Sequence, residues 1–264
     1  MTIIILPGNA AYNELNAQPM VAHRNLLAEG TITNALLPAA APRADAVTQD
    51  TSEFWAPTGA DTLRCTLAGS QAASICFIDA HTLGSQGRTL TLERFTGVWA
   101  TITTYAPAND DPFMIVFPDE SRTGFGIGVS GACQIGVAWI GPRLVIPGGV
   151  VPGYVPFWAA KRIEKFPAVT RRGHFRGQRI ERAGASLTAQ FMPVPHSFAL
   201  NDMAAFRQHY NEGNAFVWAP APSVFTEDVA YCWADQDRTL SHSIQAGGLL
   251  TDLSIAMEAY AGRP

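Results

Sequence analysis

The run over residues 53–103 constrains the fold most, because its hydrophobic pattern has the period of β-strands. Residues 61–67 and 89–95 alternate apolar and polar side chains, which is typical of strands with one face in a core. Residues 74–80 are almost continuously apolar, as expected for a strand covered on both faces. Between them, residues 81–87 contain two glycines, which favour a turn. These strands predict a β-sandwich in the first half of the chain.

Composition divides the 264 residues into regions. Residues 1–50, rich in Ala, Asn and Pro, predict an extended N-terminal arm with a short helix near Met20–Leu27. Residues 51–146 carry the strand pattern and predict a jelly-roll β-sandwich. Residues 147–160, with their many prolines and glycines, predict a linker or a loop that lies over a neighbour. Residues 161–264 predict a second, smaller β-sandwich that carries one helix.

The second half of the chain shows the hydrophobic period of β-strands and, in one segment, that of an α-helix. Residues 166–172 and 178–182 predict a pair of strands around a glycine-containing turn, and more strands are expected at 185–191, 215–218, 229–233 and 249–260. One helix is expected where apolar side chains recur at helical spacing, between an Asn201–Asp202 N-cap and Gly213. The residues with that spacing are Met203, Phe206, Arg207 and Tyr210. The fold class is therefore mainly β.

Charge is scarce and unevenly distributed. Only 15% of residues are charged, against about 25% in typical domains, which is expected of a surface partly covered by neighbours or of a compact core. Residues 161–182 hold eight Lys or Arg and two Glu, a net charge of +6, so the rest of a chain of net charge −4 carries −10. Such segregation favours a basic strand pair meeting an acidic face of another copy. A solvated hairpin remains open, as does nucleic-acid binding. The subunit-interface candidates are Arg171, Arg172, Arg176, Arg179 and Arg182.

Catalytic and metal motifs are absent from the sequence. The four cysteines have no metal-like spacing and predict small buried side chains, and the six histidines are scattered. No Gly-x-Ser-x-Gly elbow occurs, and the glycines at 124, 126 and 128 are better explained by close strand packing than by phosphate binding. The acidic pairs at 110–111 and 119–120 predict turns, with calcium as the alternative. The sequence predicts neither an enzyme nor a cofactor.

Two further features bear on location and ligands. The apolar start of the chain lacks a basic region and meets Pro7–Gly8 after too few residues for a signal peptide or a membrane span, so synthesis in the cytoplasm is expected. Trp55, His81 and Trp99 are candidates for carbohydrate binding. Their positions in strands also fit core packing, and for the histidine a structural role.

The first half resembles a galactose-binding-like, discoidin-type jelly roll. The resemblance covers residues 53–146. It rests on Trp55-Ala56-Pro57-Thr58, an alternating strand at 63–67, a buried strand ending in His81-Thr82-Leu83-Gly84, and a second alternating strand at 89–93.

The whole chain resembles tail-tip proteins of long-tailed, siphovirus-like bacteriophages, and its second half is similar to the tail-tube-like belt domain of distal tail proteins. The resemblance rests on the order of four elements. These are the strand at 135–141, the prolines of 147–156, the string Arg179-Ile180-Glu181-Arg182-Ala183-Gly184-Ala185, and the pair Trp218-Ala219-Pro220 and Val229-Ala230-Tyr231-Cys232-Trp233.

This resemblance implies a structural protein of the virion, at the tail tip or baseplate. It implies a homo-oligomeric ring, as a hexamer, with tail tube, hub and tape-measure proteins as partners, possible fibre proteins attached, and neither nucleic acid nor membrane insertion. The alternative is a carbohydrate-binding module that recognises host surface glycans.

Overall fold

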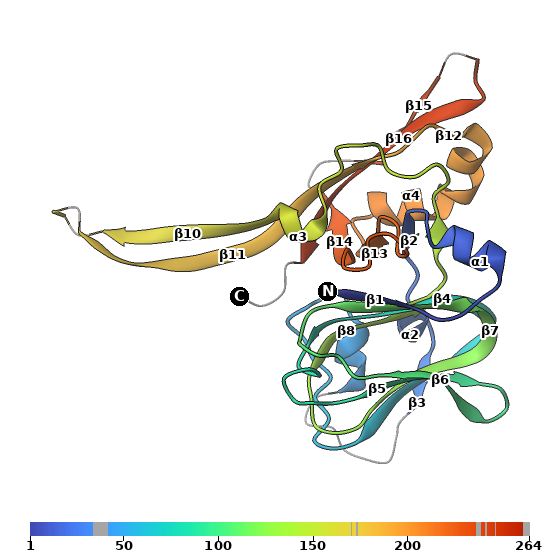
Figure 1. The fold of residues 1–264 in the computed structure, drawn as a ribbon. Helices are drawn as coiled ribbons and strands as arrows, with labels where there is room; N and C mark the ends of the chain where they lie inside the picture. The colour runs from blue at the N-terminus through green and yellow to red at the C-terminus, as the bar shows by residue number, and fades with distance from the viewer. Residues whose placement is uncertain are drawn as a thin grey trace.

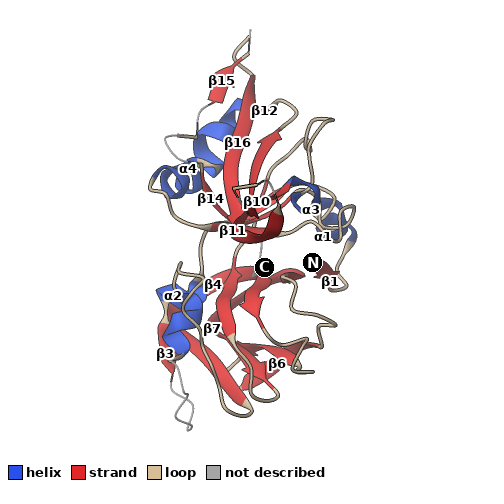
Figure 2. Ribbon diagram, turned by 90° about the vertical axis from the view of Figure 1, so that its left-hand side faces the viewer, coloured by secondary structure: helices blue, strands red, loops and turns tan. Residues whose placement is uncertain are grey.

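The computed structural model describes residues 1–33, 42–169, 171–172, 174–235, 239–240, 242–245 and 247–260. The protein is mainly β, as the sequence predicts, with two largely antiparallel sheets that lie one above the other in Figure 1. Helices cover parts of both sheets (Figure 2). They are α1 (Ala10–Leu15), α2 (Leu26–Glu29), α3 (Phe157–Ala160) and α4 (Ala204–Asn211), with a 3₁₀ turn at Arg43–Val47 and a π-helical turn at Phe198–Asp202.

The first sheet is built around two long paired strands, β4 (Asp61–His81) and β7 (Phe113–Val129). One half of the pair is flanked by β3 and β5, the other half by β8 and β1, and β6 pairs with β5. The remaining strands are β1 (Thr2–Ile5), β3 (Thr31–Thr33), β5 (Leu90–Phe95), β6 (Trp99–Tyr105) and β8 (Ile135–Gly141). The two halves of the long pair thus form two layers of one sandwich.

The long strands explain the sequence pattern and also correct it. Residues 61–67 and 74–80 belong to one strand, and so do residues 113–117 and 124–129, because the chain stays extended as it passes from one layer to the other. Two irregularities in the β4–β7 register accompany this passage. Cys76 and Ile78 point into the sandwich core, whereas Ile75 and Phe77 point the opposite way and are also buried. Residues 74–80 are apolar because both faces are covered, as predicted.

The second sheet has the strand order β10-β11-β16-β14-β13-β2-β9, with β12 and β15 also pairing with β16. Its strands are β2 (Met20–Ala22), β9 (Leu144–Val145), β10 (Lys161–Val169), β11 (Phe175–Gln190), β12 (Val194–Pro195), β13 (Phe216–Ala219), β14 (Ala230–Ala234), β15 (His242–Ile244) and β16 (Leu250–Tyr260). The expected strand pair near 166–182 is therefore confirmed as β10 and β11.

The predicted helix is confirmed as α4, which covers one face of the second sheet. Phe206 and Tyr210 are buried, and their rings lie 5.2 and 6.0 Å from that of Phe216 on β13. Gly213 ends the helix at φ +77°, a conformation that favours glycine. The predicted cap is wrong, because Asn201 and Asp202 belong to a π-helical turn that precedes α4.

The other face of the second sheet packs on the first sheet. Phe77 and Trp139, from β4 and β8, bring their rings to within 6.4 and 6.3 Å of the ring of Tyr231 on β14. All three side chains are at most 4% exposed. A shared apolar core therefore joins the sheets, which rules out independent tumbling.

Residues 1–33 and 42–50, the part of the first 50 residues that the structure describes, do not form an extended arm, and this prediction is wrong there. β1 pairs with β7 in the first sheet, and β2 pairs with β13 and β9 in the second. The helix expected over Met20–Leu27 is a strand followed by α2. The chain thus enters the second sheet before it builds most of the first. The Pro/Gly-rich segment packs on the second sheet through Phe157, and Ile146 directly before it belongs to the same core; both are at most 1% exposed.

Candidate assembly surface

The β10–β11 hairpin extends away from the rest of the molecule (Figure 1). Its register runs from Lys161 opposite Ala185 to Val169 opposite Phe175. Within the described part of the chain, β16 pairs with β11 from Gly184 to Gln190. The outer part of the hairpin is consequently a two-stranded ribbon. Such a ribbon is marginally stable by itself in water and gains stability when another surface covers it.

The tip of this hairpin, defined as residues 171, 172 and 174–176, is exposed and basic. Arg171, Arg172 and Arg176 are exposed and form no ion pair with the described residues. Phe175 is 66% exposed. The other two interface candidates, Arg179 and Arg182, lie on β11, but their side chains fall outside the described part of the structure. The tip thus combines cationic and aromatic side chains, a pattern enriched at protein interfaces.

The carbohydrate-binding candidates do not form a surface. Trp55 is 0% exposed and lies in the core of the first sheet. His81 is 4% exposed; its Nδ1 accepts a hydrogen bond from Leu83 N, and its Nε2 lies 2.9 Å from the carbonyl oxygen of Asp111. Burial lowers the pKa of His81, so the ring is expected to be neutral. Both residues are structural, and neither can stack on a sugar at the surface.

Trp99 differs from these two, because it is partly exposed on β6. One face of its ring is covered by the guanidinium of Arg64, 4.7 Å from the ring centroid. Arg64 is in turn held by Glu93, with nitrogen–oxygen distances of 2.8 and 3.0 Å. The ring is therefore already occupied by a protein group.

The glycines at 124, 126 and 128 have the packing role that the sequence indicates. A Cβ at Gly124 would lie 2.9 Å from the carbonyl oxygen of Cys65 and 3.3 Å from the ring of Trp99. One at Gly126 would lie 2.9 Å from the Arg64 side chain. Side chains from neighbouring strands lie across this bare backbone, as close strand packing requires.

The acidic pairs are engaged within the fold. Asp110 accepts a hydrogen bond from Ser85 N, and Asp111 pairs with the N-terminal ammonium at 3.1 Å. Glu120 is bound by Arg94 and Arg122 and lies within β7, so the turn predicted there is wrong. Across the described ranges, no three His, Cys, Asp or Glu side chains are grouped closely enough to hold a metal ion. The same part of the chain contains no helix long and apolar enough to cross a membrane. All four cysteines are free and buried, as predicted.

Two titratable groups, one buried and one partly buried, lie where segments of the chain pack together. Asp228 is 1% exposed; its Oδ1 accepts a 2.8 Å hydrogen bond from Phe157 N, and burial raises its pKa. This bond fixes the chain where α3 begins, at the base of the hairpin. His23, directly after β2, packs against the rings of Phe206 and His209, and burial lowers its pKa to about 4.

One surface feature was not anticipated. A groove lies where β11 ends and β16 begins, and it is lined by residues between 151 and 254. Its walls come from residues at 151, 190–193, 242–243 and 252–254, which span about 100 residues of the chain, so no local pattern marks it.

Comparisons with known proteins find similarity in solved structures. No family model matches, and no curated protein matches. Chitosan-binding module 1 from a chitosanase/glucanase of Paenibacillus sp. IK-5 is 15% identical, covering 45% of this chain and 98% of that one at a TM-score of 0.37. A pectin-binding carbohydrate-binding module is 14% identical, covering 42% and 91% at 0.32. A fucosidase from Ruminococcus gnavus is 10% identical, covering 46% and 27% at 0.36. At this level of similarity, what those proteins bind does not transfer to this chain.

Proposed function

We propose that this protein is a structural subunit that assembles with copies of itself through the β10–β11 hairpin. The observation that carries the proposal is the outer ribbon, which leaves the body and ends in exposed arginines and Phe175. A two-stranded ribbon is marginally stable by itself and is expected to gain stability from contact with another subunit. The resemblance to phage tail-tip proteins suggests the setting, a ring at the tail tip or baseplate made of six copies that links the tail tube to the hub.

Charge supports the same proposal. The segment 161–182 carries +6 and the rest of the chain −10, so a basic hairpin can approach an acidic body on the neighbouring copy. A contact of this kind between two different surfaces of the same chain repeats head to tail, and it closes into a ring when the rotation allows.

The test is light scattering behind size-exclusion chromatography, at about 0.05 M and about 1 M salt. We expect an oligomer that weakens at high salt, because the Debye length falls from more than 10 Å to about 3 Å. The variant Arg171→Gln/Arg172→Gln/Arg176→Gln should be monomeric. Its control, Gln86→Glu/Ala108→Glu/Ser121→Glu, makes the same change of net charge at exposed positions of the first-sheet region and should still assemble. A wild-type chain that stays monomeric at every concentration would refute self-assembly.

The second candidate function is recognition of carbohydrate by the first sheet. Trp99, Arg64 and Glu93 favour it, because they place an aromatic ring beside charged hydrogen-bonding groups on one partly exposed face. Binding of chitosan or pectin oligosaccharides, measured by calorimetry and lost in Trp99→Ala, would establish it. Under the assembly proposal no sugar binds, because Arg64 covers the ring.

A further inference from the structure

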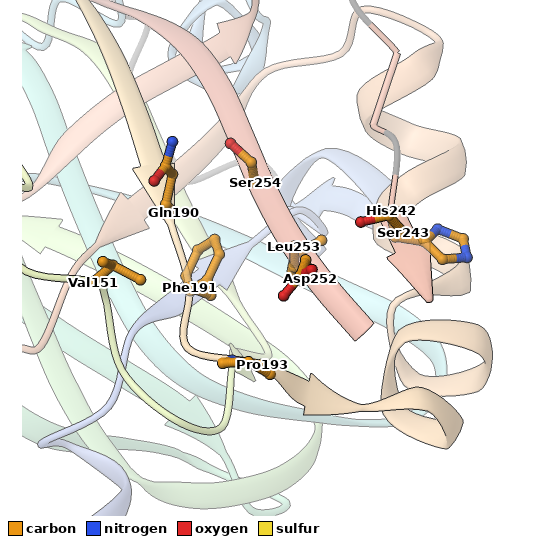
Figure 3. A pocket seen from close by; sticks show the side chains of 9 residues that line it. All are labelled: Val151, Gln190, Phe191, Pro193, His242, Ser243, Asp252, Leu253 and Ser254. Atoms are coloured by element: carbon orange, nitrogen blue, oxygen red, sulfur yellow. The ribbon is translucent and has the colours of Figure 1, made fainter. Parts of the chain in front are cut away.

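The groove at the end of β11 combines an apolar floor with a polar rim (Figure 3). Its volume is about 490 Å³. Phe191 and Leu253, each 4% exposed, lie in its centre, and exposed Asp252 lies beside Leu253. The full lining is Val151, Gln190, Phe191, Pro193, His242, Ser243, Asp252, Leu253 and Ser254.

Exposed apolar side chains also lie outside the groove. Ile244, which follows the lining residue Ser243 on β15, is 57% exposed, and Leu249, just before β16, is 81% exposed. Exposed apolar side chains of this size beside a hollow are typical of interaction sites.

The groove and the hairpin tip complement each other. The tip offers Phe175, whose ring needs an apolar surface, and three arginines that are unpaired among the described residues. The groove offers the rings and methyl groups of its floor and the carboxylate of Asp252. That carboxylate accepts a 2.8 Å hydrogen bond from the neutral amide of Gln245 and has no ion pair with any residue the structure describes.

One strand carries both surfaces. β11, a strand of 16 residues, begins at Phe175 in the tip and ends at Gln190 in the groove wall. At 3.2–3.4 Å per residue these ends lie about 50 Å apart along the strand. The two regions lie on opposite sides of the second sheet in Figure 1. A tip therefore cannot reach the groove of its own chain, only that of another copy.

We propose that the hairpin tip of one copy docks in this groove of the next copy. Phe175 lies against Phe191 and Leu253, and a tip arginine faces Asp252. This inference rests on the proposed function and specifies its acceptor site. Because tip and groove are different surfaces, each copy gives one contact and receives one, which is the arrangement of a ring.

Cysteine cross-linking tests the contact directly. Full-length Phe175→Cys is mixed with full-length Ser254→Cys under oxidising conditions, and with Ser186→Cys as the control pair. Ser186 and Ser254 are both exposed, and Ser186 lies on β11 away from the groove. The four native cysteines are buried and should not interfere. We expect a disulfide-linked heterodimer at least tenfold more abundant with Ser254→Cys than with Ser186→Cys.

A blocking variant gives an independent readout. Ser254→Trp fills the groove and should weaken self-association roughly 10- to 100-fold, the effect of denying burial to one aromatic side chain. Ser186→Trp should leave self-association unchanged. An oligomer that forms equally well with both tryptophans, and equal cross-linking of both pairs, would overturn the docking site while self-assembly stands. A wild-type chain that neither oligomerises nor cross-links would overturn both proposals.

Discussion

Two pairs of long strands in this protein have opposite surroundings. β4 and β7 span 21 and 17 residues and are enclosed over much of their length by the sandwich core on one face and the second sheet on the other. β10 and the outer part of β11 pair with each other alone. The first pair is apolar where it is enclosed, whereas the second is rich in arginine and lysine. Long strands buried within the molecule need apolar side chains, and a hairpin with this composition is suited to a partner outside it.

Removing a ring from the enclosed pair should have the largest effect. Phe77→Ala deletes a fully buried side chain between the two sheets and should lower the free energy of unfolding by about 3–5 kcal/mol. Urea denaturation followed by fluorescence measures this. Phe175→Ala, the same change at the exposed tip, should cost less than about 0.5 kcal/mol. Equal losses of unfolding free energy for Phe77→Ala and Phe175→Ala would contradict the view that the enclosed pair stabilises the fold and the hairpin tip does not.

The buried ion pair of the first sheet gives the next effect. Arg43 binds Asp61 with nitrogen–oxygen distances of 2.5 and 2.6 Å, and their side chains are 8% and 3% exposed. Arg43→Met leaves the carboxylate of Asp61 buried without its cation and should cost about 3 kcal/mol or more.

Arg24→Met is the matched control, because it breaks the Arg24–Glu29 pair, whose side chains are both 40% exposed. Its cost should stay below about 1 kcal/mol. Chemical denaturation of the two variants side by side measures the difference. A loss for Arg24→Met as large as for Arg43→Met would contradict this assignment.

Sequence reasoning succeeded where a strand is long and its neighbours decide its pattern. The alternation at 61–67 and 89–95 identified β4 and β5, and the patterns at 166–172 and 178–182 identified the two strands of the hairpin, although β11 already begins at Phe175 and so includes Gly177. It failed in the first 50 residues, because β1, β2 and β3 have only three or four residues each and pair with partners far along the chain. Three or four residues are too few for an alternation of apolar and polar side chains to be recognised in the sequence.

The candidate site was predictable only in part. The basic hairpin followed from composition, because arginines cluster within 22 residues. The burial of Trp55 and His81 agrees with the core and structural roles that their positions in strands favour. The sequence does not separate them from Trp99, which is partly exposed, because whether an aromatic side chain faces a core depends on what packs across it. The groove depends on β11, β15 and β16 meeting at one place, which only the tertiary fold determines.

Lowering the pH should destabilise the contact between His23, directly after β2, and helix α4. His23 is partly buried beside His209 and Phe206 of α4, with Arg24 and Glu29 also near, and its Nδ1 has no hydrogen-bond partner among the described residues. Its pKa falls from 6.5 to about 4 through burial first, then His209 and Arg24, against an opposing effect of Glu29. The unfolded chain therefore binds a proton that the folded chain does not, and stability declines as the pH falls from 6.5 towards 4.

The expected loss is about 1–3 kcal/mol over that range, measured by denaturation at several pH values. His23→Gln should reduce the fall in unfolding free energy between pH 6.5 and 4. His242→Gln, on exposed β15, should leave that fall unchanged. If the unfolding free energy of the wild-type protein does not fall over this pH range, His23 does not have a lowered pKa in the folded protein.

Removing the outer hairpin should have the smallest effect on stability and the largest on assembly. Arg162 lies opposite Gly184, so residues 163–183 can be replaced by an Asn-Gly turn that closes the shortened hairpin. The cores of both sheets do not include this ribbon among their described members, so the melting temperature should change by no more than about 2–3 °C. The variant should also be monomeric by light scattering. If it melts far below the wild-type protein when both are monomeric, the hairpin supports its own chain, and the contrast with β4 and β7 disappears.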